Sequence, residues 1–159
     1  MSQRENWNKA WNVNVAGTQI MTHTFVPLLL QSSSPRLLFM ASGTSTFADK
    51  THAAFPFNQG LPKGWPKQVF SVAAYRSSKA GMNMMMRGWW RLLQEDGVRV
   101  WCISPGYLAT GLGGVGAEKL KTMGADDPEP AGRFVVSVVQ GSRDADVGLV
   151  ITKDGAQTG

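Results

Sequence analysis

Apolar and polar residues follow one another in blocks along the chain, and these blocks predict helices separated by short strands. Residues 5–31 are predicted to form a helix, because the following side chains recur three or four positions apart: Trp7, Trp11, Asn14, Thr18, Met21 and Phe25. Asn14 is an amide within a largely apolar stripe, so it needs hydrogen-bond partners if it is buried. Pro27 is expected to tighten or kink the end of this helix.

Short apolar runs bounded by turn residues predict three strands, at 36–41, 98–104 and 148–152. The clearest helix is 71–95, which Gly97 follows, and one of its faces carries Tyr75, Lys79, Met82, Met86, Trp89 and Leu93. Further helices are expected at 117–123 and 128–140, the second with these residues facing inward: Phe134, Val135, Val138 and Val139. Residues 46–70 hold several prolines and glycines and are interpreted as a long irregular excursion. Strands that alternate with helices favour an α/β layer with parallel strands and right-handed crossovers.

The length and composition are those of a single folded unit. The chain has 159 residues, of which 43% are hydrophobic and 17% charged, which argues against disorder and for one domain, or a piece of one, over 1–159. The single Cys102 excludes an internal disulfide and suits a reducing compartment. Because the sequence lacks a long apolar run and a signal peptide, we expect a cytoplasmic protein with no membrane contact.

The charge pattern bears on possible partners. A net charge of +5 permits binding to nucleic acid, but the basic residues are scattered, which is typical of an ordinary solvated surface. We therefore expect no nucleic-acid partner, although a basic nucleic-acid binder remains an open hypothesis. His23 and His52 are isolated, and with one cysteine the chain offers no metal-ligand set.

The candidate chemistry starts from Tyr75 and Lys79, which lie four positions apart and are therefore neighbours on one helix face. An ammonium beside a phenol stabilises the phenolate, so such a pair can exchange a proton with an alcohol or a carbonyl. Ser42 and the Pro105-Gly106 turn each follow a predicted strand. Ligands of open α/β sheets bind beyond the carboxyl ends of the strands, so these groups are expected to share one edge.

Five motifs in this order resemble the short-chain dehydrogenase/reductase family. The matching segments are Val13-Asn14-Val15-Ala16-Gly17, Leu38-Phe39-Met40-Ala41-Ser42, Tyr75-Arg76-Ser77-Ser78-Lys79, Pro105-Gly106-Tyr107-Leu108-Ala109-Thr110, and Gly148-Leu149-Val150-Ile151 ahead of Asp154-Gly155. The resemblance implies a Rossmann-like, doubly wound parallel sheet that is present here only as its C-terminal part.

The resemblance also implies a role for each matching residue. Tyr75 would be the acid/base, Lys79 would stabilise its phenolate and hold the nicotinamide ribose, and Ser42 would orient the reacting carbonyl. Asn14 would position a water in a proton relay. The nicotinamide carboxamide would be held by the backbone and hydroxyl groups of Pro105, Gly106, Leu108 and Thr110. The implied activity is hydride transfer between NAD or NADP and a small-molecule carbonyl or secondary alcohol.

The same resemblance implies a homodimer or homotetramer that assembles through the helices at 5–31 and 71–95. The methionines at 82–86 together with Trp89 and Trp90 are interpreted as core plus subunit interface. The gap from Ser42 to Tyr75 is longer than is usual in the family, and its aromatic residues, Phe55, Phe57 and Trp65, are expected to form a wall of the substrate site.

The Gly-rich turn that anchors the pyrophosphate in the family has no counterpart ahead of the Asn14 helix. A literal G-x-G-x-x-G occurs at Gly111, Gly113 and Gly116, but it lies too far beyond the preceding strand, so we interpret it as a loop over the substrate pocket. Without the first half, the strand at 36–41 is expected to present an unpaired edge. The chain is then either part of a longer enzyme or an inactive remnant that acts only as an oligomerising or interaction fragment.

Overall fold

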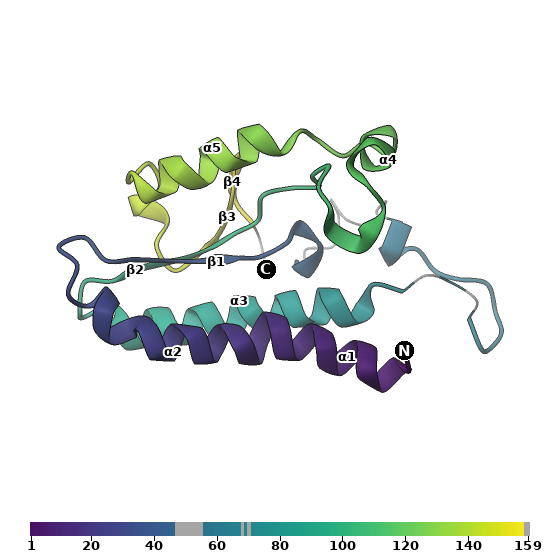
Figure 1. Cartoon of the computed structure of the whole chain (residues 1–159), viewed down its shortest axis with the longest axis horizontal. Helices are drawn as coiled ribbons and strands as arrows, with labels where there is room; N and C mark the ends of the chain where they lie inside the picture. Colours follow the sequence, from purple (N-terminus) through teal and green to yellow (C-terminus); the bar gives the residue numbers. More distant parts are fainter. Residues whose placement is uncertain (47–55, 68, 70, 158–159) are drawn as a thin grey trace.

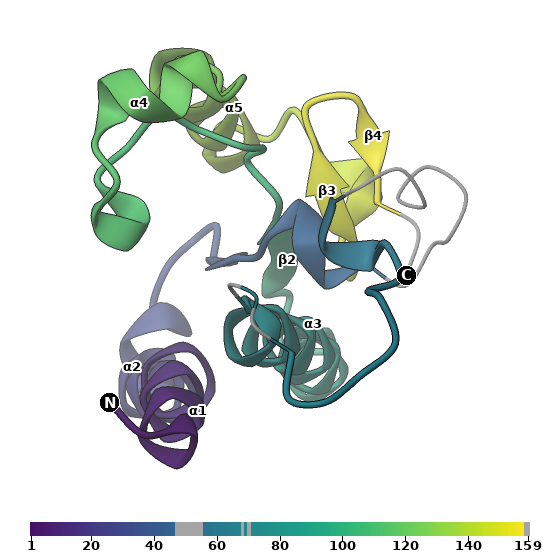
Figure 2. The same ribbon diagram turned by 90° about the vertical axis from the view of Figure 1, so that its right-hand side faces the viewer.

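The computed structural model of the chain describes residues 1–46, 56–67, 69 and 71–157. A small sheet lies between two helical layers, with α1, α2 and α3 on one side and α4 and α5 on the other (Figures 1 and 2). Helices on both faces of a largely parallel sheet give the Rossmann-like, doubly wound arrangement that the sequence predicted.

The sheet has the order β1-β2-β3-β4. Its strands are β1 (Arg36–Met40), β2 (Arg99–Ile103), β3 (Val150–Thr152) and β4 (Gly155–Ala156). The first three strands are parallel, and the register places Met40 beside Ile103, so β1 and β2 end at the same level. The parallel arrangement predicted for these three strands is confirmed, and a further strand that was not predicted, β4, folds back antiparallel onto β3. Within the part of the chain that the structure describes, the other edge of β1 has no strand partner, as expected.

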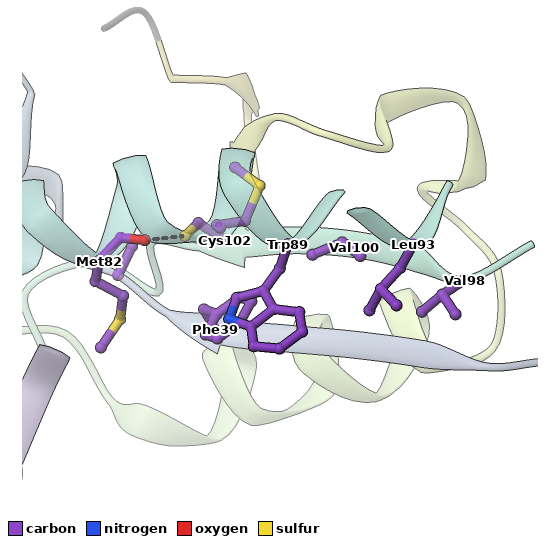
Figure 3. Packing of buried hydrophobic residues seen from close by; sticks show 9 residues of the cluster. Phe39, Met82, Trp89, Leu93, Val98, Val100 and Cys102 are labelled. Atoms are coloured by element: carbon purple, nitrogen blue, oxygen red, sulfur yellow. Dashed lines mark hydrogen bonds between the residues drawn. The ribbon is translucent and has the colours of Figure 1, made fainter. Parts of the chain in front are cut away.

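The long helix α3 (Ala73–Leu93) covers one face of the sheet. Its predicted inner face is confirmed: Met82, Met86, Trp89 and Leu93 are buried against β1 and β2. Figure 3 shows Trp89 and Leu93 beside Val98 and Val100, with the Met82 carbonyl accepting a hydrogen bond from Cys102.

The opposite face of the sheet is covered by α5 (Pro128–Val139), which the short α4 (Ala117–Thr122) precedes. Asp127 caps α5 by accepting a hydrogen bond from the Glu129 amide. Val138 is buried against Trp101, Ile103 and Ile151, whereas Val139, which was predicted to face inward, is 51% exposed. The shorter turns are 3₁₀ helices: η2 (Gly43–Ser45), η3 (Pro56–Asn58), η4 (Leu112–Gly114) and η5 (Asp144–Asp146).

The predicted helix at 5–31 is continuous but contains a π-helical turn. It runs through α1 (Gln3–Trp11), the π turn η1 (Asn12–Gly17) and α2 (Thr18–Leu29), and its start is closed by a capping box between Ser2 and Glu5. Pro27 lies inside α2, in its last turn. A π turn holds one more residue than an α turn, so it rotates everything that follows.

This rotation corrects the predicted stripe of the first helix. Trp11 and Asn14 contact α3 as expected. Beyond the π turn the inward positions are Thr22, Val26 and Leu29 instead of Met21 and Phe25, which are 57% and 50% exposed. Regular 3.6-residue spacing could not reveal this shift, because the sequence pattern carries no mark of the extra residue.

Candidate functional site

The site is built at the carboxyl ends of β1 and β2. Ser42 lies two residues beyond the end of β1 and is the N-cap of η2, where its Oγ lies 2.9 Å from Thr44 Oγ1 and accepts a hydrogen bond from the Thr44 amide at 3.2 Å. The Ala41 amide still donates to Ile103 across the sheet, so the ladder continues up to the residue before Ser42. Ser42 is therefore placed by the last rung of the sheet and by its own turn.

Tyr75 and Lys79 lie in the first turns of α3, and both are half-buried. The Lys79 Nζ lies 5.8 Å from the centroid of the Tyr75 ring and donates a 2.7 Å hydrogen bond to the Met40 carbonyl at the end of β1. The ammonium of Lys79 thereby reaches the end of β1, two residues before Ser42. That Ser42, Tyr75 and Lys79 act together in one pocket stays a prediction.

Burial shapes the electrostatics of Lys79. Burial lowers the pKa of this ammonium because it penalises the charged form, and the Cys102 thiol opposes that shift. Burial also raises the pKa of Cys102 to about 12, while Lys79 acts in the opposite direction. The lysine is thus a partly desolvated cation at the end of β1.

Asn14 reaches α3 from the π turn. Its Nδ2 donates a 2.9 Å hydrogen bond to Ser78 Oγ, and this buried hydroxyl donates to the Tyr75 carbonyl at 2.8 Å. The amide thus contacts the residue that precedes Lys79, and the direct partner is a serine. That Asn14 positions a water in a proton relay stays a prediction.

The loop that follows β2 carries the remaining predicted residues. It begins Pro105-Gly106, and Gly106 has φ +100°, a conformation that glycine adopts without strain. Leu108 forms a bridge with Asp126, and the Ala109 amide donates to the Asp126 carbonyl at 2.9 Å. Thr110 Oγ1 accepts a hydrogen bond from the Leu112 amide at 3.2 Å. The loop is therefore held from behind by the segment at Asp126.

The glycine motif at 111–116 behaves as a turn. Strand β2 ends at Ile103, and the glycines lie around η4, where Gly113 and Gly116 have φ +78° and +90°. A Cβ placed at any of the three glycines of the motif would meet no atom within 4 Å, so close packing does not require them. The geometry agrees with the interpretation that this is not a dinucleotide fingerprint.

Two site residues escaped the sequence reasoning, Arg76 and Asn83. Both donate to the turn that contains Ser42: Arg76 Nε to the Thr44 carbonyl at 2.9 Å, and Asn83 Nδ2 to Ser45 Oγ at 3.0 Å. Along α3, Arg76 lies three positions before Lys79, and Asn83 lies four positions after it. This polar spacing beside the apolar stripe was the signal that could have identified them.

The surroundings of the site are open. A groove of about 470 Å³ runs between α1, α3 and η2, and the following residues line it: Trp7, Thr44, Ser45, Thr46, Ala73, Arg76, Ser77 and Ala80. Ser42, Tyr75 and Lys79 do not line this groove. Of the aromatic residues expected to wall the substrate site, Phe57 is 45% exposed and Trp65 88% exposed, whereas Phe55 lies outside the described residues.

Two further features concern ligands and membranes. Among the residues that the structure describes, no three His, Cys, Asp or Glu side chains come together in a way that could hold a metal ion. His52 lies outside these residues. In the same part of the chain, no helix is both long enough and apolar enough to cross a bilayer.

Comparison with known proteins decides the family. The family model for short chain dehydrogenases matches residues 65–120, which include Tyr75, Lys79 and the Pro105-Gly106 turn. The short-chain dehydrogenase/reductase TropE of Talaromyces stipitatus is 48% identical over 159 residues, which cover 98% of this chain and 59% of that protein. EupG of a Phoma species, also a short-chain dehydrogenase/reductase, is 45% identical over 150 residues. This chain belongs to the short-chain dehydrogenase/reductase family.

The extent of the match bears on what the chain represents. The match to EupG covers 91% of this chain and 54% of EupG. The chain therefore spans between half and two thirds of the length of these two relatives.

Solved structures confirm the fold. The NADPH-bound carbonyl reductase from chicken fatty liver superposes with a TM-score of 0.75 at 16% identity, over 99% of this chain and 59% of that one. The RhlG/NADP complex of Pseudomonas aeruginosa superposes with a TM-score of 0.69 at 20% identity, over 98% and 60% of the two chains. At these identities the likeness establishes the Rossmann-like architecture.

Proposed function

We propose that the protein is an NAD(P)-dependent oxidoreductase that interconverts a small-molecule carbonyl compound and its secondary alcohol, with Tyr75 as the acid/base. The observation that carries this proposal is the meeting of α3 with the end of β1: Lys79 binds the Met40 carbonyl, two residues before Ser42, and lies beside the Tyr75 ring. Family membership and neighbours solved with NADPH or NADP support it.

The residues present fit the nicotinamide half of such a cofactor, NAD or NADP. An ammonium has three N–H donors, and among the described residues the Met40 carbonyl accepts one from Lys79, so further donors suit the hydroxyls of a ribose. The polar backbone at Pro105, Gly106 and Leu108, with the Thr110 hydroxyl, would hold the carboxamide at the adjoining strand end. When bound, the cofactor supplies the hydride chemistry.

The protein side of the reaction is a proton transfer with prearranged donors. In the reducing direction Tyr75 gives its phenolic proton to the oxygen of the substrate, and Ser42 donates a hydrogen bond to that same oxygen. Lys79 stabilises the resulting phenolate by charge. Asn14, through Ser78 and the Tyr75 carbonyl, holds the helix turn from which the phenol projects. Oxidation of the alcohol runs through the same groups in reverse.

Replacing Tyr75 tests the proposed acid/base. In the natural protein that contains this sequence, we expect Tyr75→Phe to reduce kcat by about 100- to 10,000-fold, because the ring stays but the proton donor is lost. The measurement is the disappearance of NADPH or NADH absorbance with para-nitrobenzaldehyde as the carbonyl probe. Tyr107→Phe is the matched control, since Tyr107 is 50% exposed on the loop after β2. Normal turnover by Tyr75→Phe would refute the mechanism.

A second candidate function is assembly without catalysis, which exposed apolar side chains on the first helix favour. Val13 and Ile20 are each 64% exposed, and Leu28 is 61% exposed. We expect a homodimer or homotetramer under either function. A chain that forms oligomers in light scattering, yet gains no thermal stability from NAD, NADH, NADP or NADPH, would be an interaction fragment instead of an enzyme. The single buried thiol suits the reducing cytoplasm, which is the location we propose.

A further inference from the structure

Three side chains on one face of α3 donate hydrogen bonds to the short segment that runs from the end of β1 through the Ser42 turn. Arg76 bonds the Thr44 carbonyl, Lys79 the Met40 carbonyl and Asn83 the Ser45 hydroxyl, at 2.9, 2.7 and 3.0 Å. Two of these three residues, Arg76 and Asn83, have no role in the proposed chemistry. Their common target is the turn that carries Ser42.

Arg76 connects three parts of the molecule. Besides its bond to Thr44, its Nη1 donates to the Phe57 carbonyl at 3.2 Å and its Nη2 donates to Asn58 Oδ1 at 2.7 Å. The planar guanidinium thereby joins η2 and η3 to the helix turn that begins with Tyr75. Such a fork fixes an angle as well as a distance, because its donors point in set directions.

Asn83 acts on Ser42 through one intermediate hydroxyl. Ser45 Oγ accepts from Asn83 and donates to the Ser42 carbonyl at 2.6 Å. Asn83 Oδ1 is buried and has no partner among the described residues, so its amide leaves an acceptor unsatisfied while its NH₂ group holds Ser45. A polar side chain in that state costs stability, which argues for a role other than packing.

Two backbone amides of the turn donate hydrogen bonds to Ser42, so their exchange depends on the position of Ser42. The Ser45 amide donates to the Ser42 carbonyl at 3.0 Å, and the Thr44 amide donates to Ser42 Oγ at 3.2 Å. Rotation of the Ser42 side chain or a shift of its backbone must therefore break at least one of two identifiable amide bonds. The core residues of α3, Met82, Met86, Trp89 and Leu93, make none of these contacts.

We propose that Arg76 and Asn83 are positioning residues that lock the Ser42 turn onto α3 and so set the place of the Ser42 hydroxyl relative to Tyr75. Arg76 holds the turn at the Thr44 carbonyl, and Asn83 holds it at the Ser45 hydroxyl. This inference rests on the proposed function for its effect on turnover. Whether Arg76 and Asn83 hold the turn in place can be measured without any enzyme activity.

The test compares Arg76→Gln and Asn83→Leu with Arg91→Gln in the natural protein that contains this sequence. Arg91→Gln is the matched control, because Arg91 is an exposed arginine in the last turn of the same helix. We expect each site variant to lower kcat with para-nitrobenzaldehyde by about 10- to 100-fold, the scale of a misplaced catalytic group, with an unchanged KM for the cofactor. Arg76→Lys keeps the charge without the fork and should restore only part of the loss.

Amide hydrogen exchange gives the second readout. The Thr44 and Ser45 amides should exchange faster in Arg76→Gln and Asn83→Leu than in the wild type, while core amides of α3 stay protected. The control variant should change neither. Unchanged exchange at Thr44 and Ser45 would overturn the proposal, as would a loss of protection spread evenly over the whole molecule.

The two readouts separate this inference from the function on which it rests. Tyr75→Phe should abolish turnover and leave exchange at Thr44 and Ser45 as it is. If the wild type has no reductase activity but the exchange result holds, the turn is locked as proposed and the enzyme assignment fails. If turnover behaves as proposed but both variants keep full kcat, the positioning role fails.

Discussion

At the scale of single residues, Cys102 illustrates how the core constrains the site. It lies in the middle of β2 with no exposed surface, and its thiol is 4.0 Å from the Met82 carbonyl. Burial holds its pKa at about 12, and the thiol in turn influences the half-buried Lys79. Cys102 has no exposed surface, yet its thiol acts on the pKa of Lys79, a residue of the proposed site.

This burial predicts a loss of stability in alkali. The unfolded thiol releases its proton around pH 9.0, whereas the folded one keeps it to about pH 12, so between these values the folded state binds more protons. The free energy of unfolding should therefore fall by about 1.4 kcal/mol per pH unit above pH 9.0. Urea unfolding on either side of that pH measures the slope.

Cys102→Ala supplies the comparison for this prediction. The variant should start from a lower stability because of the cavity, yet lose less stability as the pH rises. Lys79, whose pKa is lowered, contributes a slope of the opposite sign. Because the thiol opposes that lowering, its removal strengthens the Lys79 slope in the variant, which widens the difference between the two proteins in the same direction. An identical alkaline slope in the two proteins would contradict the assignment of the effect to the thiol.

At the scale of elements, the π turn between α1 and α2 is the feature that places Asn14. Gly17 ends this turn, and a Cβ at that position would lie 2.9 Å from the Asn12 carbonyl oxygen. The turn is wide enough for one extra residue only because the glycine lets the backbone approach so closely. The position of Asn14 against Ser78 therefore depends on a residue three positions away.

Gly17→Ala should therefore disturb the first helix and the site together. We expect a destabilisation of about 1–3 kcal/mol from the steric conflict, with a lower kcat as Asn14 loses its contact with Ser78. Gly132→Ala is the control: this glycine lies in α5, is exposed, and a Cβ there meets nothing within 4 Å, so it should stabilise by about 0.5–1 kcal/mol. Chemical denaturation and steady-state kinetics measure both. A stabilised, fully active Gly17→Ala would contradict this account.

The elements also show how far the sequence could predict the molecule. The face of α3 with Met82, Met86 and Trp89 was predictable, because burial imposes a regular period on apolar side chains. Met21 and Phe25 were misplaced, because the π turn shifts the side chains that follow it by one position, and a single glycine at position 17 does not identify such a turn. The strand β4 escaped prediction since two residues are too short for any alternation.

The candidate site was predictable in part for a related reason. Tyr75 and Lys79 could be paired because helical spacing is local, and Ser42 could be added because strand ends of parallel sheets align. The partners of Arg76 and Asn83 lie far away in the sequence, in a turn whose geometry depends on Ser42 and Ser45. Contacts of that kind follow from the tertiary structure and not from a pattern.

At the scale of the whole molecule, an ion pair joins the turn after α5 to the strands of the sheet, at the end of the sheet opposite the site. Asp144, in the turn after α5, accepts a 2.9 Å hydrogen bond from Arg36 at the start of β1 and lies 3.3 Å from Arg99 at the start of β2. The pairing lowers the pKa of Asp144, chiefly through the hydrogen bond from Arg36. The candidate site and the ion pair of Asp144 with Arg36 and Arg99 thus lie at opposite ends of β1 and β2.

Asp144→Asn should reduce stability without changing turnover. Because the folded pKa of the carboxyl lies below its ordinary value of 3.8, its contribution is complete above that value and disappears as the pH falls through the folded pKa. The side chain of Asp144 is 36% exposed, so solvent screening limits the expected loss at neutral pH to about 1 kcal/mol. Thermal unfolding across the acid range measures it. A drop in kcat at unchanged stability would contradict this prediction, because it would show that the ion pair of Asp144 affects the candidate site.

The π turn has a genetic consequence. A gene shorter by one codon within 12–17 would encode a regular α-helix in which Val26 keeps its side of the helix. It would lose the bulge that carries Asn14 to Ser78. It would also move Val15 away from its place near Gly81 of α3.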